Sequence, residues 1–520
     1  RRLLALSEAQ LRKNGLEQLL VRAWKWSNQT LRMWARFVSL LALSSPLALL
    51  LPMGKYMGSH EKWEAEVVWP YVQWAIGCAG PTSIKLCQWV STRDDLLPPL
   101  WCTRLAALQD EAPTHSWAST QKQLALAFGM GWDQKISVED RTPVGSGCVA
   151  QVYKGYIKGR AEPVAIKVLH PHINESVGAD LDVLRSIAAF FESFPKLKPL
   201  GPVAIVDDFR LRMVEQLDLR NEASHLRRFI KNFENDSDVE FPYPIDEYVH
   251  EKVLVESFLT DARPILEYTG CDEETKRRLA DIGLKAVMKM LLLDNLVHGD
   301  LHPGNVMVTK KKYAAAPEAK AQAASSWLHW LGLGGGGGGG DGGGGASTAA
   351  EDELALVFLD AGLVIEMDEA GHKNLFQVLN AFTQKDGYKA GQLVVEGAVA
   401  RAAKSKAAVA LGTTSLRDEI GSPIDIEKFC NGVDTVFRKA KASERLTVEL
   451  GAYISQLFTL ACDHSVRLDP QFASVAVAMR VMEGIANRLN PDVDLVSVAG
   501  PMFLQGKWSS VTRPTDRIEK

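Results

Sequence analysis

The spacing of apolar residues changes twice along the chain, from helical to strand-like and back to helical. Between Trp69 and about Trp132 apolar residues recur at helical spacing, which predicts two or three helices. From about Ile136 to Phe258 short runs such as VAQVYKGYI and PVAIKVL predict a small sheet, around a helical block that includes Asp207 to Phe229. From Asp272 onward helical periodicity returns, interrupted by the short strands NVMV and LALVFLD. The pattern predicts an α+β protein in which a small sheet precedes a largely helical part.

An apolar stretch without charge, FVSLLALSSPLALLL, occupies residues 37–51. It contains Pro46 and is shorter than the roughly 20 residues that a spanning helix needs. Basic and aromatic residues flank it, as is typical of a headgroup boundary. We therefore expect an interfacial or re-entrant membrane anchor, with an ordinary buried helix as the alternative. Because the sequence begins at Arg1 rather than at Met, organelle targeting is inferred only indirectly.

The segment 310–353 differs in composition from the rest of the chain. It contains an Ala-rich stretch and a poly-Gly run broken by Asp341. Such a composition cannot bury enough apolar surface to fold alone. We expect a disordered loop inserted into a hairpin.

Overall composition limits the classes of function. A chain of 520 residues with 46% hydrophobic residues is large enough for two or three packed units. The 59 basic and 63 acidic residues leave a net charge of -4, which gives no reason to expect a nucleic-acid partner. The 7 cysteines include no CxxC pair, so neither a zinc site nor a disulfide framework is indicated, and a reducing compartment is expected.

Polar and small residues in the sheet region match the first requirements of a phosphoryl-transfer site. Gly145, Ser146 and Gly147 form a small-residue turn whose backbone N–H groups could approach phosphate oxygens. Lys167 ends the strand run VAIK, so it points to one face of the sheet and needs an anionic partner there. Glu222, in the following helical stretch, offers that carboxylate, as in the strand-lysine and helix-glutamate pair of kinases. Each motif alone is weak evidence.

The block VHGDLHPGN at residues 297–305 is the most specific motif. It places Asp300 and Asn305 at the spacing of the kinase catalytic loop, where the carboxylate faces the transferred phosphoryl group and the amide binds a metal ion. Asp360, in the later run FLDAG, supplies a second metal ligand at the end of a strand. His298 and His302 are expected to hold the loop rather than to act in chemistry.

These motifs together resemble the UbiB or aarF-domain family of atypical kinases, over residues 69–492. The resemblance rests on HGDLHPGN, LDAG, the VAIK lysine, an IKLCQ segment ahead of the sheet, and EG followed by LNPD near residues 483–492. It implies a bilobal protein-kinase-like fold with an N-terminal helical extension, binding ATP and Mg2+. The implied divisions are an N-terminal helical segment 1–68, a family-specific helical extension 69–135, an N-lobe 136–260, a C-lobe 261–495 that includes the insert, and a tail 496–520.

The same resemblance implies further site residues. Lys85 and Gln88 would belong to a lid over the nucleotide site, although Cys87 stands where the family has Gly. Asp218 would remain as an acidic partner of the lid lysine, because Gln216 replaces the usual Glu. The backbone from Glu256 to Phe258 is the candidate hinge for the adenine. Glycines replace the usual alanines of the nucleotide loop, which resembles one mitochondrial subtype.

We therefore expect a Mg-dependent ATPase or a small-molecule or lipid phosphotransferase that supports ubiquinone biosynthesis or lipid homeostasis at the mitochondrial inner membrane, with the plastid as the alternative. Expected partners are ATP, a lipid or quinone precursor, the membrane surface and quinone-biosynthesis proteins. A nucleotide-sensing scaffold with negligible turnover is the second reading. A protein kinase is a weaker third, because LDAGLVIEMDEAGHKN offers no phosphorylatable residue.

Overall fold

The structure is a computed structural model of the whole chain. It describes residues 30–31, 33–54, 60–91, 99–106, 114–194, 202–311, 354–384, 386–408, 426–442 and 470–491, with isolated positions between 456 and 502. The expected loop 310–353, apart from its first two residues, and the expected tail 496–520, apart from Met502, lie outside the described residues.

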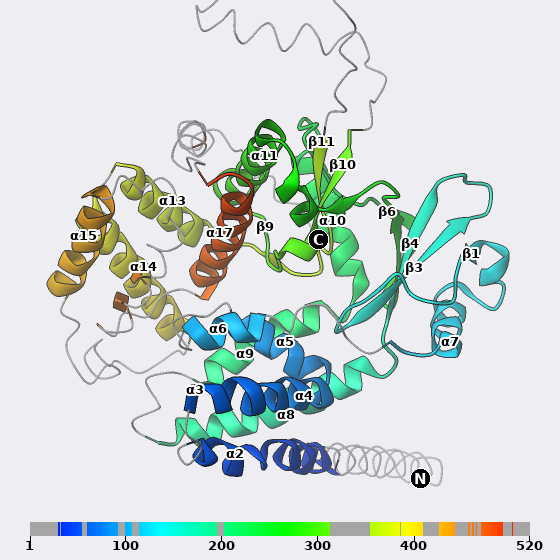
Figure 1. Cartoon of the computed structure of the whole chain (residues 1–520), viewed down its shortest axis with the longest axis horizontal. Helices are drawn as coiled ribbons and strands as arrows, with labels where there is room; N and C mark the ends of the chain where they lie inside the picture. Colours follow the sequence, from blue (N-terminus) through cyan, green and yellow to red (C-terminus); the bar gives the residue numbers. More distant parts are fainter. Residues whose placement is uncertain are drawn as a thin grey trace, which may run out of the picture.

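An antiparallel sheet forms the smaller lobe, on the right in Figure 1. Its strands are β1 (Ile136–Val138), β2 (Gly145–Ser146), β3 (Ala150–Ile157), β4 (Pro163–Leu169), β6 (Pro244–His250) and β7 (Val253–Ser257). The strand order is β1-β3-β4-β7-β6, and β2 pairs with β3. Side chains alternate across β4, so that Ile166 packs with helix α7 (Trp117–Phe128) on one face while Lys167 points to the other.

Helix α10 (Leu219–Asn232) contacts β6 and β7 and carries Glu222. Asp218 caps this helix, because its side chain accepts a hydrogen bond from the backbone N–H of Arg220. Two helices, α8 (Ile173–Glu192) and α9 (Pro202–Glu215), precede it and pack against each other. The block expected from Asp207 to Phe229 is thus divided between α9 and α10.

The larger lobe is mostly helical and lies on the left in Figure 1. Its buried helix α11 (Glu273–Leu292) packs against α17 (Pro470–Leu489). The other described helices of this lobe are α13 (Glu369–Thr383), α14 (Gly387–Ala408) and α15 (Ile426–Ala442).

Short strands lie near the lobe boundary. One sheet contains β5 (Val239–Glu240), β8 (Arg263–Pro264), β10 (Val306–Lys310) and β11 (Leu354–Phe358). In a second sheet β9 (Val297–His298) pairs with β12 (Val364–Ile365). Three short 3-10 helices complete the described elements of both lobes: η2 (Trp132–Gln134), η4 (Ile265–Gly270) and η5 (Pro303–Asn305).

A layer of N-terminal helices lies along the lower edge of the molecule in Figure 1, beside α8 and α9. It contains α2 (Leu47–Met53), α3 (His60–Trp63), the π-helix η1 (Glu64–Val68), α4 (Trp69–Ala79), α5 (Pro81–Ser91) and α6 (Pro99–Ala106). With α7, the described part of residues 69–132 holds four α-helices rather than two or three. The extra boundary arises at Gly80, whose φ of +89° ends α4, and at Pro81, which begins α5.

The apolar stretch belongs to a helix that is longer than expected. Within the described residues, Met33–Met53 is the one helix long and apolar enough, at 21 residues, to cross a membrane by length and composition. Signal sequences and core helices of soluble proteins also meet this criterion. Pro46 interrupts this segment as expected, because residues 45–46 form a turn and Pro46 is the N-cap of α2, where a missing N–H is tolerated.

Candidate active site

A cavity of about 590 Å³ lies between the small sheet, the α10 helix and the loops of the larger lobe. Its lining brings together the residues expected to act, which come from segments far apart in the sequence. They are Lys85 and Gln88 from α5, Gly145, Ser146 and Gly147, Lys167, Glu222, Glu256 and Phe258, and Asp300, Asn305 and Asp360. Asp218 is the expected site residue that does not line it.

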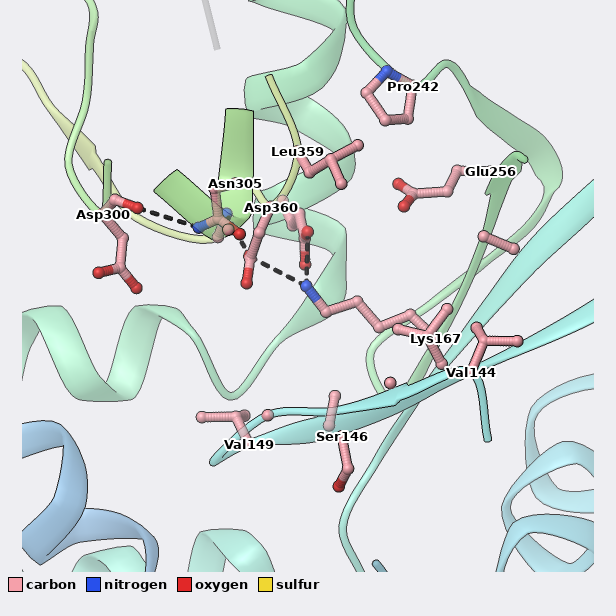
Figure 2. Close-up of a pocket in the computed structure, with 18 of the residues that line it drawn as sticks. Val144, Ser146, Val149, Lys167, Pro242, Glu256, Asp300, Asn305, Leu359 and Asp360 are labelled. Carbon is pink, nitrogen blue, oxygen red and sulfur yellow. Dashed lines mark hydrogen bonds and ion pairs between the residues drawn. The ribbon is translucent and has the colours of Figure 1, made fainter. Parts of the chain in front are cut away.

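Lys167 lies at the centre of a charged cluster. Its Nζ is 2.7 Å from Glu222 Oε1 and 3.0 Å from Asp360 Oδ1, and Figure 2 shows the Lys167 side chain extending toward Asp360. Burial lowers the pKa of Lys167, but Asp360 and Glu222 outweigh this effect and raise it. Burial raises the pKa of Glu222 to about 7 although Lys167 opposes the shift. Lys167 is therefore a fixed positive charge beside carboxylates.

The β10–β11 hairpin places Asn305 and Asp360 together. Val306 pairs with Phe358, so Asn305 just before β10 and Asp360 just after β11 lie at the same end of the hairpin. Asp360 has a φ of +54°, an unfavourable conformation for a residue with a side chain. Burial raises the pKa of Asp360, but Lys167 and Lys85 lower it by more, so the side chain is held as a carboxylate.

His298 holds the backbone around these residues. Its Nε2 lies 2.8 Å from the Leu359 carbonyl oxygen, and its Nδ1 accepts a hydrogen bond of 3.3 Å from the Asp300 N–H. Burial lowers the pKa of His298, so the ring is neutral, with the proton on Nε2. His302 Nδ1 likewise accepts from the Gly304 N–H at 3.2 Å. Both histidines thus have the structural contacts that the sequence predicts.

The lid lysine has a different partner from the one expected. Lys85 forms an ion pair with Asp300, whereas Asp218 is bound by Arg220, whose Nη2 lies 2.6 Å from Asp218 Oδ2. The expectation that Asp218 contacts Lys85 is wrong for this structure, because Asp218 faces its own helix start. Burial raises the pKa of Asp300, but Lys85 lowers it by more.

The nucleotide loop leaves open space beside its glycines. A Cβ atom added to Gly145 would meet nothing within 4 Å, and one added to Gly147 would meet only the Ala150 carbonyl oxygen at 3.7 Å. The described glycines with a positive φ do not include Gly145 or Gly147. The fold does not require glycine at either position, so their small size leaves room in the cavity for a ligand.

A pair of histidines that the sequence did not single out supports this loop. His170 Nε2 lies 2.9 Å from the Gly147 carbonyl oxygen, and His170 Nδ1 lies 2.8 Å from His115 Nδ1. Burial lowers the pKa of both rings, and His170 adds to the effect at His115, whose pKa falls to about 4. The two residues are 55 positions apart, so no local motif indicates their contact.

The expected hinge differs from the prediction in one respect. The backbone N–H of Phe258 donates to Pro163 and that of Ser257 donates to Tyr243, so neither amide points to the cavity. Glu256, Ser257 and Phe258 all line the cavity, but not through these two amides. Strand pairing explains the difference, because it already uses these amides.

Comparison with known proteins identifies the family. The model of the ABC1 atypical kinase-like domain matches residues 107–394, and that of the UbiB helical domain matches residues 444–494. The chain belongs to the ABC1/UbiB atypical kinase-like family. Both the predicted family resemblance and the predicted α+β, kinase-like fold are confirmed.

Relatives within the ABC1/UbiB family cover most of the chain. A Dictyostelium discoideum protein named as a probable serine/threonine-protein kinase is 28% identical over 91% of this chain and 69% of its own length. A mitochondrial ABC1 family protein of Saccharomyces cerevisiae is 29% identical over 90% of this chain and 74% of its own length. A mitochondrial ABC1 family protein of Schizosaccharomyces pombe is 29% identical over 81% of this chain and 63% of its own length. This chain therefore spans about two thirds of the length of these relatives. A solved complex of a Mycobacterium tuberculosis protein with erythromycin is 18% identical to this chain and covers 80% of it and 90% of that protein's own chain. The TM-score between the two structures is 0.45.

The chemistry of the site fits a magnesium ion. Among the described residues no group of three or more His, Cys, Asp and Glu side chains is arranged to hold a metal. Mg2+ commonly takes one or two protein oxygens and completes its shell with water and phosphate. Asn305 and Asp360 suit this mode, because Asn305 Nδ2 donates to the Asp300 carbonyl oxygen at 3.0 Å and leaves its Oδ1 as the ligand atom.

Proposed function

We propose that this ABC1/UbiB family member binds ATP with Mg2+ in the cavity and transfers or hydrolyses the terminal phosphoryl group. The observation that carries the proposal is the contact of Lys167 with both Glu222 and Asp360 within one cavity that also contains Asp300 and Asn305. An always-charged lysine beside two carboxylates is suited to hold phosphate oxygens next to a bound cation.

Each residue has a distinct proposed role. Gly145, Ser146 and Gly147 would approach the phosphates, and Lys167, held by Glu222, would bind the α- and β-phosphates. Asn305 and Asp360 would bind Mg2+, which neutralises phosphate charge when it is bound. Asp300, whose pKa is held below its usual value, would accept a hydrogen bond or a proton from the phosphoryl acceptor.

The proposed acceptor is a small molecule or lipid rather than a polypeptide. Lys85 already pairs with Asp300, and α5 lines the cavity on the side where an acceptor would approach that residue. This arrangement favours an acceptor small enough to reach Asp300 beneath the lid. The family resemblance and the mitochondrial relatives support a role in ubiquinone biosynthesis or lipid homeostasis in mitochondria, with quinone-biosynthesis proteins as partners.

We also propose that the protein rests on a membrane surface, at the inner mitochondrial membrane. Three contacts attach the helix Met33–Met53 to the protein: Arg36 Nη2 donates to Asp180 at 3.2 Å, Tyr71 to the Leu43 carbonyl at 2.7 Å and Trp63 to the Leu50 carbonyl at 2.9 Å. The helix residues in these contacts, Arg36, Leu43 and Leu50, are seven positions apart, which places them on one side of the helix. The other side exposes apolar residues, including Trp34, Val38 and Leu41. A helix held flat in this way supports an interfacial anchor rather than a span.

The test is ATP turnover by the purified protein with and without Mg2+, anionic liposomes and a quinone-precursor analogue. Wild type is compared with Asp360→Asn and with the exposed control Asp133→Asn. Turnover that rises with liposomes or analogue and disappears only in Asp360→Asn supports the proposal. Nucleotide binding without turnover in every condition would contradict it and favour the nucleotide-sensing scaffold, for which the Lys85–Asp300 ion pair is the supporting observation.

A further inference from the structure

Glu256 is a buried acid that the proposed mechanism does not use. In the antiparallel pair β4–β7, Lys167 lies opposite Leu254 and Ala165 lies opposite Glu256. Residues directly opposite each other share a face of the sheet, and so do residues two apart along a strand. Glu256 therefore points to the same side as Lys167, and Figure 2 shows its carboxylate directed into the cavity.

The Glu256 carboxyl group lacks a hydrogen-bond partner at one oxygen. Its Oε2 is buried and has no partner within the described part of the chain. Burial is the largest cause that raises the pKa of Glu256, and the charges of Glu222 and Asp360 raise it further. Lys167 opposes these effects, and the resulting pKa is about 8. An unpaired buried polar oxygen is costly, unless a ligand supplies the missing hydrogen bond.

The neighbouring cavity wall suits a flat ring. Val152 and Ala165 from the sheet and Met307 from β10 line the cavity, and their side chains are apolar. Ala165 lies directly opposite Glu256, so the acid stands at the edge of this apolar region, and Lys167 lies two residues further along β4. A base placed between these apolar side chains would present its edge to Glu256 while its phosphates extend past Lys167.

We propose that Glu256 is a specificity-determining residue, whose Oε2 accepts a hydrogen bond from an exocyclic amino group on the base of the bound nucleotide. This inference rests on the proposed nucleotide binding and adds which base is preferred. A carboxyl group keeps an acceptor oxygen whether it is ionised or protonated, so the contact is available in both states. Adenine, which carries such an amino group, is the favoured base.

The experiment compares the affinities of ATP and purine riboside triphosphate, which has hydrogen in place of the 6-amino group, in the presence of Mg2+. Wild type should bind ATP roughly tenfold more tightly, as expected for one buried hydrogen bond to an acidic group. Glu256→Met, which keeps the bulk but removes the acceptor, should lower this ratio to about one. Glu256→Gln retains an acceptor oxygen and should keep the preference, and Glu247→Met, on the exposed side of β6, is the matched control.

Two results would overturn the inference while leaving the proposed function intact: equal binding of the two triphosphates by wild type, or an unchanged ratio in Glu256→Met. Failure of wild type to bind either triphosphate would overturn the proposed function and this inference together. Thermal unfolding of each variant verifies that it is folded, and the Glu256→Gln result separates loss of the acceptor from general damage to the site.

Discussion

Lys167 Nζ lies 2.7 Å from Glu222 Oε1, which joins strand β4 to helix α10 through a buried ion pair. Removing the lysine by Lys167→Met leaves the Glu222 and Asp360 carboxylates without this cation and removes the proposed phosphate contact. We expect ATP affinity at least about tenfold weaker, since charged hydrogen bonds contribute ~1.5–3 kcal/mol. Calorimetric titration measures it, with Lys252→Met at the β6–β7 turn as control. An unchanged affinity of Lys167→Met for ATP would show that the phosphates do not contact Lys167.

The ion pair between Lys85 and Asp300 predicts a shift in the pH profile of turnover. Lys85 holds the pKa of Asp300 below its usual value, so Asp300 stays ionised in acid. In Lys85→Met this pKa rises, and the acidic limb of the turnover profile moves to higher pH. Lys285→Met, an exposed change on α11, should leave the profile in place. A limb that does not move would show that Asp300 does not control the reaction.

The hydrogen bond from His170 to the nucleotide loop predicts an effect on binding without direct ligand contact. His170→Asn removes the contact with the Gly147 carbonyl and frees the loop, which should weaken ATP binding roughly fivefold, the value of one ordinary hydrogen bond. His172→Asn is the control, because His172 is exposed and has a φ of +58°, which Asn tolerates. Equal affinities in both variants would argue against loop positioning by His170.

Burial of Glu256 predicts that stability depends on pH. Its pKa rises from 4.5 in the unfolded chain to about 8 in the fold, so the protonated form is favoured on folding. This contribution to stability is fully present below pH 4.5 and is lost as the pH rises through about 8. Glu256→Gln carries no charge and should therefore gain in Tm over wild type as the pH rises from 5 to 9. Scans at pH 5, 7 and 9 test this, and Glu247→Gln should track wild type throughout.

The outward face of the Met33–Met53 helix predicts where lipid contact is lost. The double substitution Val38→Ser and Leu41→Ser removes exposed apolar area without changing the half-buried attachment points, so liposome binding should fall roughly tenfold while Tm is unchanged. Cosedimentation with anionic liposomes measures this. The double change of Leu126 and Met130 to Ser, also exposed but near α7, should have no effect. Unchanged liposome binding by the Val38 and Leu41 variant would show that this face of the helix does not contact lipid.

The sequence was most informative where the chemistry lies within one short segment. Asp300 and Asn305 are five positions apart, and their loop carries its own recognisable spacing. Lys167 could be placed on a sheet face because strand alternation is a local property.

Contacts between distant segments could not be predicted in the same way. The partner of Lys85 depends on how α5 lies across the larger lobe, and the contact of His115 with His170 depends on the docking of the segment before α7. The unpaired oxygen of Glu256 could be recognised only from the complete surroundings of its side chain. The length of the segment Met33–Met53 was underestimated because its helical residues extend beyond both ends of the uncharged stretch 37–51, whereas the interruption at Pro46 was predicted and lies at the start of α2.

The hairpin β10–β11 separates the proposed metal ligands from the Gly-rich segment of the sequence. Its register runs from Val306 opposite Phe358 to Lys310 opposite Leu354, so Asn305 and Asp360 adjoin one end and residues 312–353 connect the other. The entropy of closing a connecting loop grows only slowly with length, by about 0.6 kcal/mol for each doubling. Insertions and deletions between Lys310 and Leu354 can therefore accumulate during evolution, or be made in the laboratory as a tag or reporter fusion, without moving either ligand.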